Sequence, residues 1–487
     1  MRKIVLIIIV VILSIAALKV VLFLTAKPKA TVDYIAECNK ITRPADYNPE
    51  DNAAPYYQKA FESFVKKPEE LKKLKERYLF QRLTRLDSSQ QTILKEWLAS
   101  NSKAFEYFHI AANKPYDWIE RHIEREHLHQ AVISSPELIS PMYDLVEAVL
   151  WRARLNASQQ KYSEAFEDII DCYRAGKQKY RTPSWGHDCH FGFIFIHQAL
   201  FNAFIILDEE HVDIDSSILK SFQDALQTEL NSDTYDITDL RMAKLMRYDE
   251  IQRFFVYNGK GTGRLYWKVA IGYYWNVAMP RTSSNCFSKA FSYSFIGPTQ
   301  NEVTNKTELI SVLFDSFEAL KKQTPWELHN SDKNYFKKMG AIAESIAESN
   351  LEFGPLYPPG EHFHNYYKTR AHTDALITAL AIFRFKNDYN RFPETLDELV
   401  STGYLESLPM DPYSDGPLVY KLTEDDFLLY SWGTNFTDDG GIAYTTDMTD
   451  IFLQLYTPNL PDTVYWPVKL LGELGEQEYP KTILLPQ

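Results

Sequence analysis

Residues 145–176, LVEAVLWRARLNASQQKYSEAFEDIIDCYRAG, decide how most of this chain folds. Apolar and small residues recur every three to four positions on both sides of the polar run Gln159-Gln160-Lys161, which is the spacing of one buried helix face. The stretch therefore predicts two helices joined by a tight turn at these three residues. The same kind of pattern extends over residues 27–352, so we expect a large, mostly α-helical domain there.

Some residues of this hairpin lie near the positions that a tetratricopeptide repeat requires. They are Ala148, Ala153, Tyr162, Ala165, Phe166 and Ile169. A stable solenoid needs about three such repeats, and no convincing second copy follows at the repeat spacing. The hairpin is therefore expected to be one part of a larger helical domain.

The composition is that of a globular protein with two or three domains. The chain has 487 residues, of which 45% are hydrophobic and 24% are charged. Its net charge of −13 argues against a nucleic-acid partner, because phosphate binding needs Lys and Arg. The four cysteines, Cys38, Cys172, Cys189 and Cys286, form no CxxC pair, which excludes a zinc cluster of that kind and a disulfide framework. Buried free thiols are expected, with one Cys172–Cys189 bridge as the alternative.

The N-terminus predicts a membrane anchor over residues 1–26. Residues Ile4 to Leu24 form one apolar run that is long enough to cross the hydrocarbon core as a helix. Lys19 lies near its outer end, where the side chain can reach the interface. Arg2 and Lys3 precede the run and favour a cytoplasmic N-terminus, with the bulk of the chain outside. We therefore expect a single-pass protein of the bacterial inner (cytoplasmic) membrane; a cleaved signal peptide is the alternative.

Two further segments yield no activity. Residues 66–85, KKPEELKKLKERYLFQRLTR, are basic above a helical apolar stripe, which predicts a solvated helix face or contact with an anionic membrane surface. Residues 258–264, NGKGTGR, have neither the spacing of a dinucleotide-binding loop nor the Ser or Thr of a P-loop, so a surface loop is expected.

Several histidines are candidate metal ligands and make a metal-dependent envelope enzyme the alternative function. Di-iron proteins use paired ExxH motifs on facing helices, and this spacing occurs three times, at Glu124/His127, Glu126/His129 and Glu361/His364. Glu361 follows Pro358-Pro359-Gly360, which is not expected to be a helix interior. His187, Cys189 and His190 are close in sequence and could bind a transition metal, although a core or interface role is favoured. No GxSxG or HExxH motif is present.

A linker, FGPLYPPG at residues 353–360, separates the helical region from a C-terminal module. After it, one helix is expected over Tyr366 to Asn387, followed by a short helix that begins at Pro393. Residues 418–422 and 427–430 read as strands around the acidic turn Glu424-Asp425-Asp426. We expect the helical region and the module to fold separately, with fold class α+β overall.

The module resembles the globular part of the type II secretion major pseudopilin (protein G). The residues that carry the resemblance are Phe392-Pro393, Leu396, Leu399, Leu408-Pro409, Asp411-Pro412, Gly416, Tyr420, Phe427, Leu429, Ser431 and Gly433. It implies a helix plus antiparallel sheet at residues 361–454, ahead of a Pro-containing strap at residues 455–487. A pseudopilin helix runs directly into its head, whereas here residues 27–352 intervene. The resemblance therefore concerns this module alone and implies a structural or protein-interaction role, without an enzymatic activity.

The resemblance also implies a calcium site in the acidic loop that follows Ser431. Oxygen ligands are offered by Asn435, Asp438, Asp439, Asp447 and Asp450, and calcium prefers such ligands. The spacing is not that of an EF-hand, and a solvated acidic turn is the alternative.

Overall fold

The computed structural model describes residues 2–72, 83, 86–121, 136–181, 187–232, 241–257, 263–266, 311–312, 315, 323–331, 359–441 and 461–468. The helices are α1 (Arg2–Thr25), α2 (Tyr34–Thr42), η1 (Pro49–Asp51), α3 (Ala54–Ser63), α4 (Glu69–Lys72), α5 (Ser88–Ser100), α6 (Ser102–Ala112), α7 (Pro136–Ala157), α8 (Tyr162–Arg181), α9 (His187–Glu210), α10 (Ser216–Asn231), α11 (Arg241–Phe254), α15 (Pro325–Ser331), α17 (Pro359–Tyr389), α18 (Leu396–Ser401) and η5 (Gly433–Asn435). The strands are β1 (Phe255–Tyr257), β2 (Gly263–Leu265), β3 (Val419–Leu422), β4 (Phe427–Ser431) and β5 (Thr463–Trp466).

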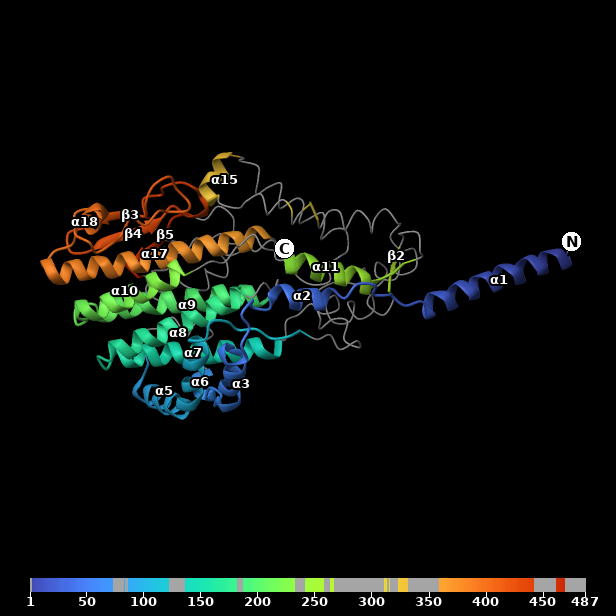
Figure 1. Ribbon diagram of the computed structural model, residues 1–487, viewed down its shortest axis with the longest axis horizontal. Helices are drawn as coiled ribbons and strands as arrows, with labels where there is room; N and C mark the ends of the chain where they lie inside the picture. The colour runs from blue at the N-terminus through green and yellow to red at the C-terminus, as the bar shows by residue number, and fades with distance from the viewer. Residues whose placement is uncertain are drawn as a thin grey trace.

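The molecule is a layered stack of helices with a small sheet on one side. Figure 1 shows α7, α8, α9, α10 and α17 lying across the body, with the sheet beyond α17 and with α3, α5 and α6 on the opposite side. Helix α1 projects from one end of the body, crosswise to the direction in which the layers stack. The described part of the chain is therefore mostly helical, as predicted, with a three-stranded antiparallel sheet near the C-terminus.

Helix α1 is long and apolar enough to cross a membrane. Its segment Arg2–Leu22 buries none of its length in the rest of the molecule, and its large apolar side chains are 42–64% exposed. A second segment, Phe191–Glu210 of α9, passes the same test of length and hydropathy but is 89% buried. The two segments therefore differ in kind, because α9 is covered by protein whereas α1 has no such cover.

The predicted helical hairpin is confirmed. Helix α7 ends at Ala157 and α8 begins at Tyr162. Gln160 adopts the left-handed conformation (φ 60°), and the Lys161 N–H donates to the Asn156 carbonyl at 2.9 Å, which closes the turn. The turn therefore falls where the polar run interrupts the apolar pattern.

Glycine allows α8 and α9 to approach each other closely. A Cβ atom on Gly176 would lie 2.6 Å from the Gly192 carbonyl oxygen and 2.7 Å from Cγ1 of Ile196. A Cβ on Gly192 would in turn lie 2.5 Å from the Tyr180 backbone nitrogen. Both positions therefore require glycine, and their contact fixes the central helix pair of the stack.

One continuous cluster of buried apolar side chains runs from α3 to β5. It passes through α7, α8, α9, α10 and α17, and it includes residues on both sides of the predicted linker. Phe166 of α8 stacks on Phe222 of α10 at 4.2 Å between ring centroids, and Phe204 of α9 stacks on Tyr465 of β5 at 6.4 Å. The domain boundary stays a prediction, since residues 353–358 lie outside the described ranges, but the apolar core does not divide there.

The module is built on α17, which is longer than predicted. It begins at Pro359, so the predicted start at Tyr366 was wrong, and Glu361 lies in its first turn rather than in its interior. The reason is that proline at the first helical position lacks only an N–H that would have no partner there. The predicted start of the short helix at Pro393 was also wrong, because α18 begins at Leu396 after an extended Thr395.

The sheet has the order β3-β4-β5, and both of its pairings are antiparallel. In β3 and β4, Val419 pairs with Tyr430 and Leu422 with Phe427, which confirms the two predicted strands. Strand β5 falls within the segment expected to be a strap, but three of its four residues are buried, with Trp466 only 2% exposed. Trp466 stacks on Phe427 at 5.5 Å and meets Phe383 of α17 edge-on at 5.0 Å, so β5 joins the sheet to the helices.

Cys38 and Cys172 are free, buried thiols, as expected. Burial raises the pKa of the Cys38 thiol to about 11 and raises that of Cys172 as well. Neither group is therefore a thiolate near neutral pH. The side chain of Cys189 lies outside the described residues.

Candidate functional site

Asp411 connects the two halves of the C-terminal sequence pattern. Its carboxylate accepts hydrogen bonds from the Ser431 hydroxyl at 2.7 Å, the Trp432 N–H at 2.9 Å and the Tyr413 N–H at 3.0 Å. The side chain is buried, and burial raises its pKa while these donors lower it. The D-P turn and the strand that ends at Ser431 are therefore held together by one carboxylate, which positions the loop that follows.

That loop carries the predicted calcium ligands. The Tyr430 hydroxyl donates to Asp438 Oδ1 at 2.8 Å, and the Asn435 amide donates to Asp439 Oδ2 at 2.7 Å. Gly440 and Gly441 both have positive φ, at 84° and 77°, so the chain turns back sharply after the two aspartates. Asn435, Asp438 and Asp439 thus lie within one tight turn beside β4.

A fourth polar residue joins the loop from a distant part of the sequence. Asp462 immediately precedes β5, is 2% exposed, and accepts the Gly441 N–H on Oδ2 at 2.7 Å. Burial raises the pKa of this carboxyl, and the neighbouring charges of Asp438 and Asp439 raise it further. Asp462 is thus a buried carboxylate close to two others, which is the electrostatic situation that a cation relieves. Sequence reasoning missed it because its segment was taken for a surface strap.

The loop does not by itself complete a metal site. Within the described ranges, no group of three or more His, Cys, Asp and Glu side chains converges closely enough to hold a metal ion. Asp447 and Asp450 lie outside those ranges. Calcium binding at Asn435, Asp438, Asp439, Asp447 and Asp450 therefore stays a prediction, with Asp462 added to it.

Most of the histidine candidates also lie outside the described residues. This holds for Glu124, Glu126, His127 and His129, and for the side chains of Glu361, His187 and His190. His364 is described; its ring stacks parallel to that of Tyr413 at 6.3 Å, and burial lowers its pKa to about 3. A neutral imidazole packed on an aromatic ring inside the module fits a core role.

The structure pairs two other histidines that the sequence did not single out. His197 of α9 and His372 of α17 lie with their Nδ1 atoms 3.0 Å apart, and Thr369 Oγ1 lies 3.1 Å from Nε2 of His197. Burial lowers the pKa of both rings, to about 3 for His372, so both are neutral near pH 7. A neutral pair at this distance shares one N–H···N hydrogen bond, which fixes the register of α9 against α17.

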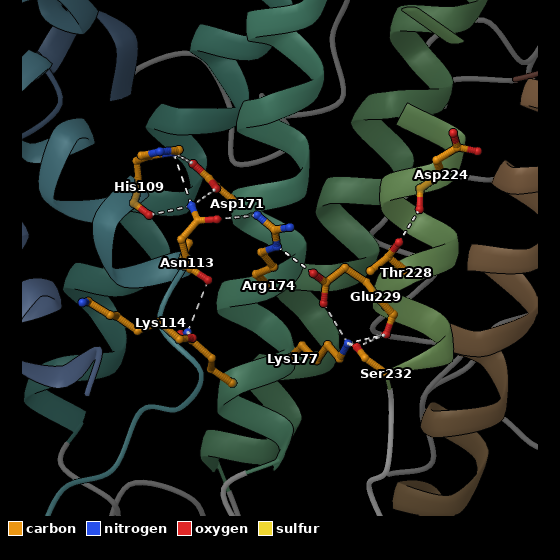
Figure 2. Close-up of polar contacts among 12 residues, drawn as sticks. His109, Asn113, Lys114, Asp171, Arg174, Lys177, Asp224, Thr228, Glu229 and Ser232 are labelled. Atoms are coloured by element: carbon orange, nitrogen blue, oxygen red, sulfur yellow. Dashed lines mark hydrogen bonds and ion pairs between the residues drawn. The ribbon is translucent and has the colours of Figure 1, made fainter. Parts of the chain in front are cut away.

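A longer polar network ties α6, α8 and α10 together (Figure 2). His109 Nδ1 lies 2.7 Å from Asp171 Oδ2, and the Asn113 amide donates to Asp171 Oδ1 at 3.0 Å. Arg174 donates to Asn113 Oδ1 at 2.5 Å and to Glu229 of α10 at 2.7 Å. The network thus runs without a break from the exposed side of α6 to α10.

Charge burial explains why this network is so complete. Lys177 is buried on α8 and donates to Glu229 Oε2 at 2.8 Å and to Ser232 Oγ at 2.9 Å. Burial raises the pKa of Asp171 to about 7, although the neighbouring His109 lowers it. A buried charge is tolerated only when it is paired and hydrogen-bonded, so each of these groups requires the next. The arrangement holds helices in register and resembles a structural frame more than a reactive centre.

Comparisons with known proteins found no relatives. No family model, no curated protein and no solved structure matches this chain. The function of this chain is therefore inferred from the geometry above and from the sequence pattern of the module.

Proposed function

We propose that this protein is a single-pass protein of the bacterial inner membrane with its bulk outside the cytoplasm. Its role is structural or protein-interacting, and its C-terminal module is pseudopilin-like and binds calcium. The observation that carries the proposal is the contrast between α1 and the rest of the molecule. The apolar side chains of α1 are exposed, whereas those of α9, a helix of similar length and hydropathy, are enclosed in the core. In water, α1 would expose an apolar surface far larger than a soluble protein tolerates, and a bilayer removes that cost.

The internal contacts of the module support its pseudopilin-like character. Two separate parts of the sequence pattern, Asp411-Pro412 and Ser431, are joined by the hydrogen bond to the Asp411 carboxylate. A third part, Phe392-Pro393, is joined to β3, because the Tyr420 hydroxyl donates to the Pro393 carbonyl at 2.7 Å. Gly433, another residue of the pattern, has φ 73°, a conformation that a side chain would strain. The residues of the pattern thus have structural roles that depend on one another.

The interactions of the helical body favour a scaffold over an enzyme. Several of its charged side chains form ion pairs that join neighbouring helices, such as Arg152–Asp168 between α7 and α8 and Arg174–Glu229 between α8 and α10. Such pairs contribute register and rigidity more than net stability. A rigid, anchored body that holds the module at a set place is what an interaction role requires.

Alkaline extraction of membranes tests the anchor. We expect full-length protein to stay in the membrane pellet at high pH, and a variant with Ile9→Lys and Val10→Lys to be released. Each lysine within a span costs up to about 3 kcal/mol of insertion free energy, with the largest cost at the centre. The matched control is Val212→Lys in the turn after α9, where the side chain is 79% exposed and where the change should have no effect. Release of the unmodified protein would contradict the proposal.

A further inference from the structure

Three lysines and two tyrosines alternate on the surface of α3, α6 and the turn that follows α6. The ammonium group of Lys59 lies 5.2 Å from the centre of the Tyr56 ring and 5.8 Å from that of Tyr107. The ammonium group of Lys114 lies 5.1 Å from the centre of the same Tyr56 ring, and that of Lys103 lies 5.9 Å from the centre of the Tyr107 ring. The order Lys114, Tyr56, Lys59, Tyr107, Lys103 is thus a lysine–tyrosine ladder in which neighbouring ammonium groups share one ring.

The ladder gathers positive charge that the described part of the chain does not neutralise. Within the described ranges, no carboxylate lies within ion-pair distance of these three ammonium groups. Glu62, the carboxylate on α3, accepts a hydrogen bond from Gln58 at 2.9 Å instead. Lys59 and Lys103 are exposed, and Lys114 is half-buried. Like charges held this close repel each other, and an anionic partner would relieve the repulsion.

The same chain carries a strongly acidic surface on its module. Residues 390–441 contain 11 Asp and Glu but only two basic residues, Arg391 and Lys421, and so hold most of the net charge of −13. Arg391 is already paired with Glu398. Glu424 and Asp425 at the β3–β4 turn, together with Glu406, are exposed. This surface is complementary in sign to the ladder.

The two surfaces lie on opposite sides of the molecule. In Figure 1 the helices α3 and α6 lie at one side of the stack, and the sheet with α18 lies at the other, with α7 to α10 and α17 between them. The module of a chain therefore does not reach its own ladder. We propose that the lysine–tyrosine ladder of one copy binds the acidic surface of the module of a second copy.

Such a contact joins two different surfaces, so a pair of copies still has one ladder and one acidic surface free. Further copies can bind to these free surfaces, and the contact then continues into rows of molecules. The stacking direction is crosswise to α1 (Figure 1), so neighbouring copies in a row could all keep α1 in one membrane. This parallel arrangement rests on the proposed membrane anchoring, whereas the charge pairing does not. Exposed charges are screened over roughly 8 Å at physiological ionic strength, so the contact is expected to be weak and dependent on salt.

Self-association of the full-length protein in detergent tests the pairing. We expect sedimentation velocity at 50 mM NaCl to show concentration-dependent association that is largely lost at 500 mM. Replacing Lys59, Lys103 and Lys114 by Gln should weaken it about tenfold, since each exposed ion pair contributes a modest share. The matched control is Lys220→Gln, an exposed lysine of α10 that is paired with Asp224 and lies outside the ladder.

A photo-crosslinking residue at position 103 identifies the partner surface. The expected product is a dimer in which residue 103 is joined to a peptide from residues 390–441, and Glu424→Gln with Asp425→Gln should reduce its yield. The proposal is overturned if the triple variant associates like the wild type, or if the crosslink maps elsewhere on the chain or only to other molecules. Because the measurement is made in detergent, failure of the pairing leaves the alkaline-extraction result unaffected.

Discussion

Replacing Asp411 tests whether one carboxylate holds the module together. The side chain is 3% exposed and accepts hydrogen bonds from Ser431, Trp432 and Tyr413. Alanine removes the acceptor and leaves these donors without a partner, at about 1–3 kcal/mol for each buried group. We therefore expect Asp411→Ala to lower the free energy of unfolding by about 3–6 kcal/mol. Asn keeps one acceptor oxygen of similar shape, so Asp411→Asn should cost about half as much.

Urea denaturation followed by tryptophan fluorescence measures the effect, because Trp432 and Trp466 lie in or beside the sheet. Residues 27–487 suffice for the assay, since α1 buries none of its spanning segment in the body. The control is Asp415→Ala, an exposed aspartate of the same turn that should change the unfolding free energy by less than about 0.5 kcal/mol. An Asp411→Ala variant within about 1 kcal/mol of the wild type would refute the reasoning.

Three further predictions use other parts of the molecule. Burial lowers the pKa of His372 to about 3 in the folded chain, whereas the value in the unfolded chain is about 6.5. Below pH 6.5 the unfolded chain therefore binds a proton at this side chain that the folded chain does not, and the free energy of unfolding decreases as the pH falls. Replacing His372 by Gln should therefore flatten the dependence of urea stability on pH between 6.5 and 4.5 by up to about 1.4 kcal/mol per pH unit, and an unchanged slope would count against it. Gly176→Ala should destabilise the protein by about 1–3 kcal/mol because its methyl group would meet α9, whereas Gly416→Ala, with nothing within 4 Å, should not; equal thermal shifts would contradict the close approach of the helices. Millimolar calcium should raise the melting temperature of the full-length protein in detergent by about 2 °C or more, and Asp462→Asn should remove most of that gain; a melting curve that ignores calcium would identify the loop as a solvated turn.

Local patterns predicted much of the fold. The apolar spacing on either side of Gln159-Gln160-Lys161 marked the α7–α8 hairpin, and its turn lies where the pattern is interrupted. Alternating residues and turn chemistry marked β3 and β4. These features depend on neighbours in sequence, which is why one sequence is enough to find them.

The parts that sequence reasoning missed depend on contacts between distant segments. Pairing of His197 with His372 needs α9 and α17 to lie side by side, and no local signal predicts that neighbourhood. Asp462 joins the acidic loop only because β5 pairs with β4. The shared core also could not be foreseen, because the linker at residues 353–360 indicates a break in the helix but says nothing about which helices α17 then contacts.

The measurement that tests the central proposal most directly is a pair of reporters fused after Gln487. One is active only outside the cytoplasm and the other only inside it. With α1 as the single span and the N-terminus inside, the external reporter should be active and the internal one silent. The Ile9→Lys and Val10→Lys variant should reverse this result, because the chain would then stay in the cytoplasm. Activity of the internal reporter on the unmodified protein would contradict the account.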